Sequence, residues 1–318
     1  MTLGRGSSYG DLIDLLATEL RSFPQAKWIV EKVSGLDSAS IGPLSKELVA
    51  DDVIDKAMKL VGRVKAGEPI QYVLESWDFR YLRLSINRSV LIPRPETEVV
   101  AGYVIDEIRQ RFESREDATF KDYGIDKQLF RVADLGTGSG AIALSVAKEI
   151  ESRFDIEVIG TDLSQEALEV AKTNLEALDL SVQNGVKFIQ GSWFDPLDDY
   201  LLAFDIVVSN PPYISPGQYE ELDSCVKDFE PKMALVAADE GLSDLIHIAS
   251  NAMRYLKNNG MLVLECDPDQ IDPLVKFLKQ ANYYEVESHL DLALRPRFVS
   301  GRIKANSLVA ENLDLREI

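Results

Sequence analysis

One segment constrains the fold of this chain more than any other: an apolar run that enters a glycine-rich turn and continues as a helical pattern. Val132–Leu135 has the composition of a buried strand, and Ala141–Ala147 has the apolar spacing of a helix. Between them, Gly136, Gly138 and Gly140 let the backbone turn tightly and come close to a ligand. The spacing G-x-G-x-G differs from the dinucleotide-binding G-x-G-x-x-G, and no G-K-[ST] follows to hold a triphosphate. Such a turn alone is weak support for a nucleotide-like ligand.

Further apolar runs continue this pattern towards the C-terminus. Short strand-like runs at 157–162, 186–190 and 204–209 are separated by helical segments. From about residue 97 to residue 302, strands and helices alternate in this way. That alternation predicts an α/β fold with a doubly wound, mostly parallel sheet.

The first part of the chain has a different character. Residues 9–66 show helical apolar spacing, interrupted by proline and glycine, and two strand-like runs follow at Gln71–Leu74 and Leu82–Ile86. We therefore predict a small helical domain over residues 1–68 and a β-hairpin linker over 69–94. An α/β domain over 95–303 and a loose tail over 304–318 complete the predicted organisation.

Two side chains near the predicted strand ends have two interpretations each. A carboxylate at Asp162 can accept both hydroxyls of a ribose, or it can cap the helix that opens at Ser164. Ser164 can also cap that helix itself, which would leave Asp162 free for a ligand. Trp193 follows the strand 186–190, where its ring can pack against an adenine or belong to the core.

The strand 204–209 delivers the second chemical motif, Asn-Pro-Pro-Tyr at residues 210–213. Two prolines cannot continue a strand ladder, so the chain leaves the sheet here as a stiff loop. In open α/β sheets, ligands bind at that edge. A carboxamide oxygen, a proline-fixed carbonyl and an aromatic ring suit a planar amino group, because they offer two acceptors and a flat surface. A simple strand-ending turn is the alternative.

The order of these motifs is that of class I S-adenosylmethionine-dependent methyltransferases, whose fold is Rossmann-like with a seven-stranded sheet. The chain further resembles the HemK/PrmC family of protein-(glutamine-N5) methyltransferases, which modify class-1 peptide chain release factors. The matching segments are Gly67–Tyr72, Leu91–Glu98, Asp134–Leu144, Ser209–Ile214 and Glu230–Leu235. Leu91–Glu98 is the discriminating one, since nucleic-acid methyltransferases with Asn-Pro-Pro-Tyr generally lack it.

The resemblance implies transfer of a methyl group from S-adenosyl-L-methionine, leaving S-adenosyl-L-homocysteine, to the glutamine of the release-factor GGQ loop, an event in translation termination. It implies a recognition role for the helical domain. The only two cysteines, Cys225 and Cys266, stand in no metal-binding spacing, so we expect no metal and free thiols in a reducing cytoplasm. The implied cofactor-binding residues are Gly136, Thr137, Gly138, Ser139, Gly140, Asp162, Trp193 and Asn210. The implied substrate-binding residues are Asn210, Pro211, Pro212 and Tyr213, of which Asn210, Pro211 and Tyr213 are the catalytic ones. Glu265–Gln270 and Asp291–Arg297 depart from the family pattern, which leaves the local loop geometry there open.

Charge separates the competing functions. The chain carries 53 Asp and Glu against 34 Lys and Arg, a net charge of −19, and the excess lies beyond residue 95. This disfavours the alternative of an N-methyltransferase acting on an exocyclic amine of RNA or DNA, because phosphate binding depends on Lys and Arg. A basic protein partner suits the charge, although solubility or a saline environment also explains it. A non-catalytic adaptor is disfavoured by the intact motifs. We expect no direct nucleic-acid partner and no membrane segment.

Overall fold

The computed structural model describes residues 6–117, 129–150, 154–178 and 185–304. These residues form two compact units, of which the first comprises Met1–Trp77, Ile86–Arg88 and Asp223–Phe229, and the second comprises the rest. The predicted boundaries at residues 68, 94 and 303 stay a prediction. Most of the predicted loose tail, residues 305–318, lies outside the described residues.

The first unit is helical. Its elements are α1 (Tyr9–Leu20), α2 (Phe23–Ser34), α3 (Ser38–Ile41), the 3₁₀ turn η1 (Pro43–Lys46), α4 (Asp51–Lys65), α5 (Ile70–Leu74) and α10 (Ser224–Lys227). Ser8 and Asp11 form a capping box that starts α1, and Gly35 ends α2 in the left-handed conformation. Leu12, Leu16 and other apolar residues at helical spacing form the core of this unit.

The β-hairpin is present, but its first strand lies further along the chain than predicted. It pairs β1 (Ser76–Phe79) with β2 (Leu82–Ser85). The prediction of a strand at Gln71–Leu74 is wrong, because these residues form α5. Burial of their apolar side chains in the helical core decides the outcome, since a short apolar run is equally compatible with a strand or a helix.

The second unit is built on one sheet, and it confirms the predicted doubly wound fold class. In the described residues the strand order is β5-β4-β3-β6-β7-β9-β8, with β9 antiparallel to both neighbours and the remaining pairs parallel. The strands are β3 (Phe130–Leu135), β4 (Ile156–Asp162), β5 (Val186–Gln190), β6 (Phe204–Ser209), β7 (Leu256–Glu265), β8 (Tyr284–Leu290) and β9 (Pro296–Arg302). The central strand β6 is buried throughout, as expected of a parallel strand covered on both faces.

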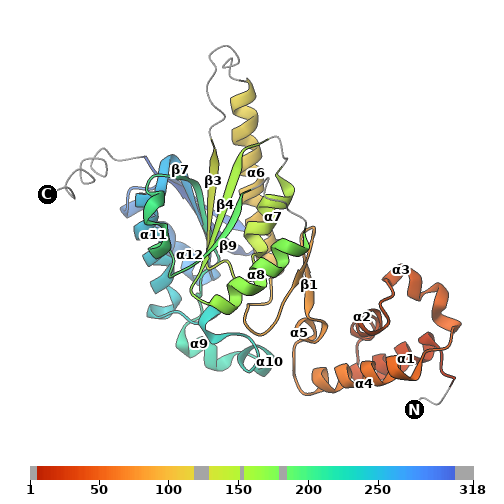
Figure 1. The fold of residues 1–318 in the computed structure, drawn as a ribbon. Helices are drawn as coiled ribbons and strands as arrows, with labels where there is room; N and C mark the ends of the chain where they lie inside the picture. Colours follow the sequence, from red (N-terminus) through yellow and green to blue (C-terminus); the bar gives the residue numbers. More distant parts are fainter. Residues whose placement is uncertain (1–5, 118–128, 151–153, 179–184, 305–318) are drawn as a thin grey trace. The chain divides into compact units, whose positions relative to one another are not determined.

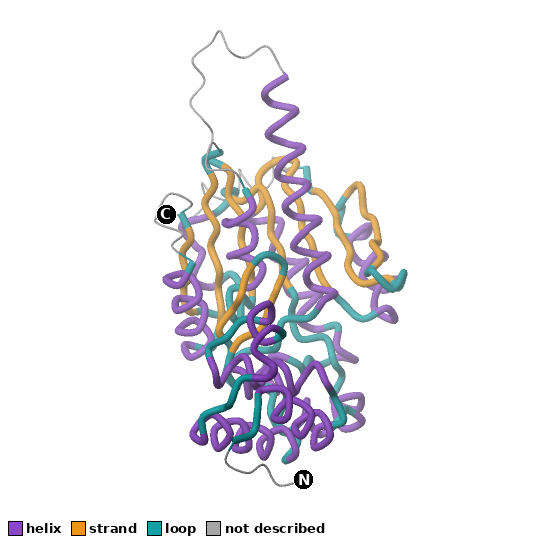
Figure 2. Tube along the Cα trace, turned by 90° about the vertical axis from the view of Figure 1, so that its right-hand side faces the viewer, coloured by secondary structure: helices purple, strands orange, loops and turns teal. Residues whose placement is uncertain are grey.

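Helices cover both faces of this sheet, as Figures 1 and 2 show. One face carries α6 (Pro95–Asp117), α7 (Ala141–Glu149) and α8 (Gln165–Ala177), and the other carries α11 (Ser243–Tyr255) and α12 (Ile271–Gln280). The remaining short elements are α9 (Pro216–Glu221), η4 (Asp195–Tyr200), η5 (Lys232–Ala234), η6 (Asp239–Gly241) and η7 (Pro268–Gln270). Strand order reverses between β3 and β6, and their carboxyl ends open a crevice of the kind in which such sheets bind ligands.

Candidate active site

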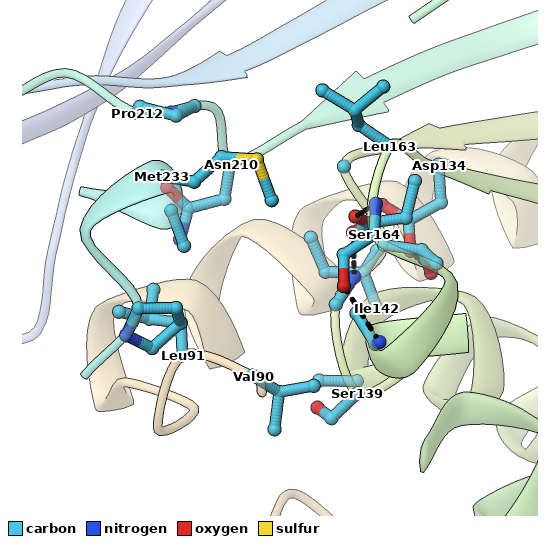
Figure 3. Close-up of a pocket in the computed structure, with 18 of the residues that line it drawn as sticks. Val90, Leu91, Asp134, Ser139, Ile142, Leu163, Ser164, Asn210, Pro212 and Met233 are labelled. Atoms are coloured by element: carbon cyan, nitrogen blue, oxygen red, sulfur yellow. Dashed lines mark hydrogen bonds between the residues drawn. The ribbon is translucent and has the colours of Figure 1, made fainter. Parts of the chain in front are cut away.

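A cavity of about 410 Å³ lies at the carboxyl ends of β3, β4 and β6. This volume is in the range of small-molecule sites. In Figure 3, Asn210 and Met233 lie on one side of the cavity, and Ile142, Leu163 and Ser164 lie across from them. The lining residues therefore come from segments far apart in the sequence.

The glycine turn forms one wall of the cavity. Gly136, Gly138 and Gly140 all have positive φ, at 70°, 56° and 81°, a region that other residues rarely adopt. A Cβ atom on Gly136 would also lie 3.2 Å from the ring of Trp193. The turn is fixed to β4, because the Thr137 amide donates to the Thr161 carbonyl at 2.9 Å. The predicted tight turn is present.

Two carboxylates hold this turn, of which Asp134 is buried and Asp162 is half-buried. Asp134 accepts hydrogen bonds from the Thr137 hydroxyl at 2.6 Å and from the Ala143 amide at 3.1 Å. Burial raises the pKa of Asp134 to about 6, and these hydrogen bonds offset only part of the rise. The carboxylate is therefore a structural acceptor that orients the start of α7 against β3.

Asp162 holds the turn from β4. One carboxylate oxygen accepts from the Gly138 amide and the other from the Ser164 amide, both at 2.9 Å. Ser164 caps α8 through its own hydroxyl, which accepts from the Ala167 amide at 3.1 Å. Asp162 is thus not the cap, and each of its oxygens keeps acceptor capacity for a ligand at the cavity wall. Burial raises the pKa of Asp162 above its ordinary value.

Trp193 lies between the cavity and the core, and its packing against an adenine stays a prediction. Its side chain lines the cavity and also packs against the core below α11. Its backbone is left-handed, with φ at 47°, which costs about 1–2 kcal/mol for a residue other than glycine. The Thr161 hydroxyl holds this conformation by donating to the Trp193 carbonyl at 2.9 Å.

Asn210 lies directly after β6 and faces the cavity. Its Nδ2 donates to the Thr97 hydroxyl at 3.0 Å, which turns the Oδ1 atom away from Thr97 and leaves it for a ligand. Pro212 also lines the cavity. Pro211 and Tyr213 are not among its lining residues. The ring of Tyr213 packs against the core instead, and burial raises its pKa well above the ordinary value.

Most of the predicted site residues therefore meet at one cavity. Those that line it are Gly136, Thr137, Gly138, Ser139, Asp162, Trp193, Asn210 and Pro212. Gly140 starts α7 behind the turn. The ligand roles assigned to all these residues stay predictions.

Further residues line the cavity besides those assigned to the cofactor and the substrate. Arg94 lines the cavity and binds the buried Glu230 carboxylate at 2.6 Å, while the Ile92 amide donates to the same carboxylate at 3.2 Å. Both partners lie in segments matched to the family, but nothing in the sequence joins them across 136 positions. Met233 and Asp244 complete this side of the cavity.

Side-chain hydrogen bonds from Gln270 hold the end of the Asn-Pro-Pro-Tyr loop. Gln270 Nε2 donates to the Tyr213 carbonyl at 2.8 Å and to the Glu240 carbonyl at 3.1 Å. Gly241 packs against this clamp with φ at 82°, and a Cβ atom there would lie 2.0 Å from the Tyr213 oxygen. Only glycine fits that position without displacing the loop.

Comparison with known proteins identifies the family to which this chain belongs. Residues 126–295 match the family model described as "Methyltransferase domain". A curated relative from Aliivibrio fischeri named "Release factor glutamine methyltransferase" is 37% identical over 81% of this chain and 82% of its own length. Proteins with the same name from Vibrio cholerae and Haemophilus influenzae are 39% and 34% identical, over 77% and 86% of this chain and 77% and 89% of their own lengths. The chain belongs to the release factor glutamine methyltransferase family.

The structure has the fold of class I S-adenosylmethionine-dependent methyltransferases, to which that family belongs. The hMettl16 catalytic domain, solved in complex with an RNA hairpin of MAT2A, superposes with a TM-score of 0.52 at 16% identity over 81% of this chain and 83% of its own. At this identity the likeness concerns the fold alone.

The residues of the cavity fit the cofactor of release factor glutamine methyltransferases, S-adenosylmethionine. A glycine cradle that a Cβ at residue 136 would narrow, acceptor capacity on Asp162 and an aromatic wall at Trp193 match an adenosyl group in shape and chemistry. Among the described helices, none is long and apolar enough to cross a membrane.

Proposed function

We propose that this protein transfers a methyl group from S-adenosylmethionine to the side-chain amide nitrogen of a glutamine in class-1 peptide chain release factors. One observation carries the proposal: the Asn210 carboxamide is oriented by Thr97 so that its oxygen is free at a cavity lined by the glycine turn. Membership of the release factor glutamine methyltransferase family supports the choice of substrate.

The chain must supply orientation, because an amide nitrogen is a poor nucleophile. Its lone pair is delocalised into the neighbouring carbonyl, whereas the sulfonium of the cofactor supplies a good leaving group. In the proposed mechanism, Asn210 Oδ1 and the Pro211 carbonyl accept the two hydrogens of the target amide, and the Tyr213 ring, which packs against the core, anchors the loop behind them. Such positioning can lower a barrier by up to about 7–11 kcal/mol. Fixed dipoles also stabilise the positive charge that develops on nitrogen.

In this proposal, residues of the cavity wall formed by the glycine turn hold the cofactor. The backbone of Gly136–Gly140 approaches the cofactor closely, Asp162 accepts from its ribose hydroxyls and Trp193 packs against its adenine. Asp134 fixes the turn from behind through Thr137 and the start of α7. None of these contacts needs a metal ion.

The protein partner completes the proposal. A net charge of −19 suits a basic surface, and the release-factor domain that carries the target glutamine must face ribosomal RNA. Binding should therefore weaken as salt is added, and an affinity independent of salt would contradict this part. Recognition by the helical N-terminal region and a cytoplasmic location belong to the same proposal.

Incubation with methyl-labelled S-adenosylmethionine and a purified release factor tests the function. We expect label on the release factor, and none when the target glutamine is replaced. Equal labelling of the replaced protein would place the methyl group elsewhere. Label on added RNA or DNA, with none on the protein, would favour an exocyclic amine as the acceptor instead.

A further inference from the structure

A buried carboxyl group behind Asn210 has no role in the mechanism described so far. Glu265 ends β7 with no exposed surface, and neither of its carboxylate oxygens has a hydrogen-bond partner of good geometry in the described part of the chain. Most buried polar groups are paired, so an unpaired carboxyl group at the edge of an active site requires an explanation.

Thr97 links this carboxyl group to the proposed catalytic amide. It is the third residue of α6 and is 5% exposed. Its hydroxyl accepts from Asn210 Nδ2 at 3.0 Å and lies close enough to Glu265 to lower the pKa of that carboxyl group. The three side chains come from α6, the end of β6 and the end of β7. The parallel register that pairs Ser209 with Leu264 places Asn210 and Glu265 beside each other where these two strands end.

A hydroxyl group has one hydrogen, and that limits what these three side chains can do. An ionised carboxylate can only accept hydrogen bonds, so it attracts the single hydrogen of the nearby Thr97 hydroxyl. The hydroxyl oxygen can then only accept from residue 210. Asn210 must therefore turn its NH₂ group to Thr97 and its oxygen to the cavity, which is the arrangement observed.

We propose that Thr97 and Glu265 are positioning residues that select the orientation of the Asn210 carboxamide in which its oxygen meets the target amide. The inference rests on the proposed function, in which that oxygen accepts a hydrogen of the glutamine amide. It assigns a role to the family-matched segment Leu91–Glu98, which supplies Thr97, and to the carboxyl end of β7.

The charge of Glu265 controls this selection. A protonated carboxyl group can donate its own hydrogen to Thr97, and the hydroxyl hydrogen is then free to turn towards Asn210 Oδ1. The Asn210 carboxamide would then flip and present its NH₂ group to the target amide. An NH₂ group cannot accept a hydrogen of that amide. Burial raises the pKa of Glu265 to about 7, so both charge states are accessible near neutral pH.

The neighbouring groups leave Glu265 as the one that changes charge in this range. The charged or titratable side chains that act on it are Arg94, Glu96, Arg297, Tyr213 and Cys266. Burial raises the pKa of the tyrosine and of the thiol, which keeps both neutral. Guanidinium groups are not deprotonated in proteins. Glu96 is held by Arg295 at 3.1 Å.

The first test removes the hydroxyl in the full-length protein. Thr97→Val keeps the shape of the side chain, and we expect kcat for release-factor methylation to fall about 10- to 100-fold. The KM for the release factor and the calorimetric Kd for S-adenosylmethionine should change by less than about threefold, because the cofactor wall is untouched. Thr97→Ser should recover most of the activity. Tyr103→Phe, which removes a hydroxyl bonded to Ser300 from the same helix, serves as the matched control.

The second test measures how kcat depends on the charge of Glu265. In the wild type, kcat at saturating substrates should fall as the pH is lowered through about 7. Glu265→Gln should remove this acid limb, because a carboxamide can donate or accept and does not titrate. Thermal unfolding of each variant confirms that it is folded.

The outcomes separate the two proposals. No labelling of glutamine by the wild type would overturn the proposed function, and this inference with it. Labelling by the wild type that Thr97→Val matches within about twofold would overturn the inference alone. The same conclusion follows if Thr97→Val weakens cofactor binding as much as kcat, or if Glu265→Gln keeps the acid limb.

Discussion

The carboxyl groups on the two sides of the cavity differ in how they are held. On the wall of the glycine turn, Asp134 and Asp162 each accept two hydrogen bonds from the turn or from the start of a helix. Behind the wall that carries Asn210, Glu265 has no hydrogen-bond partner of good geometry among the described residues. The first wall is therefore fixed before any ligand arrives, whereas the second keeps a polar group whose charge can change. Fixed groups suit an invariant cofactor, and an adjustable group suits the control of a reacting amide.

The largest effect should come from the second wall. Asn210→Ala removes the acceptor proposed for the target amide and should lower kcat by about 10²–10³-fold, as deletion of one preorganised polar group does elsewhere. The Kd for S-adenosylmethionine, measured by calorimetry, should stay within about threefold of the wild type. A large loss of cofactor affinity with unchanged kcat would place Asn210 on the first wall instead.

The first wall should respond in the opposite way. Asp162→Asn keeps one acceptor oxygen but loses the charge and one of the two backbone hydrogen bonds. We expect about 10- to 100-fold weaker binding of S-adenosylmethionine, consistent with the loss of a charge-assisted hydrogen bond. Release-factor methylation at saturating cofactor should keep a kcat within a few-fold of the wild type. Unchanged cofactor affinity would remove Asp162 from the binding wall.

The unpaired carboxyl group of Glu265 should lower the free energy of unfolding by an amount that depends on pH. Burial raises the pKa of Glu265 from 4.5 to about 7, so the folded state binds more protons than the unfolded state between these values. The contribution to the free energy of unfolding therefore falls as the pH rises through this window, by up to about 3 kcal/mol.

Glu265→Gln removes that titration. We expect the variant to be about 1–2 kcal/mol more stable than the wild type at pH 8, and about equally stable at pH 4.5. Urea denaturation at the two pH values measures the difference. A stability difference that is the same at both pH values would show that the carboxyl group does not carry the proposed charge at pH 8.

The smallest effect should come from the helix cap beside Asp162. Ser164→Ala removes the side-chain oxygen that accepts from Ala167 and should lower the free energy of unfolding by about 1 kcal/mol. The Ser164 amide still donates to Asp162, so the Kd for S-adenosylmethionine should change by less than about threefold. A loss of affinity as large as that of Asp162→Asn would mean that the cap itself contacts the cofactor.

The sequence predicted the parts of the molecule that depend on local patterns. Strands such as β3 and β6 were visible as apolar runs, because central strands in this type of sheet are covered on both faces. The glycine turn was visible because positive φ restricts the residue type. The strand expected at Gln71–Leu74 failed since helical and extended forms of a short apolar run share the same composition.

Contacts across the sheet could not be predicted in this way. The bond between Asn210 and Thr97 spans 113 positions, and no local pattern indicates which hydroxyl will face the carboxamide. The sequence also could not show that Tyr213 lies against the core rather than on the cavity lining, because an aromatic residue suits either place. Side-chain orientation depends on neighbours supplied by the folded chain.

The glycine at position 241 makes catalysis vulnerable at a site outside the cavity lining. Any larger residue there would push the main chain of Tyr213 away from Gln270, and the Asn-Pro-Pro-Tyr loop would lose its support. A natural variant with this replacement would keep every motif residue and still be a poor enzyme. Inspection of the motifs alone would therefore classify a defective allele as intact.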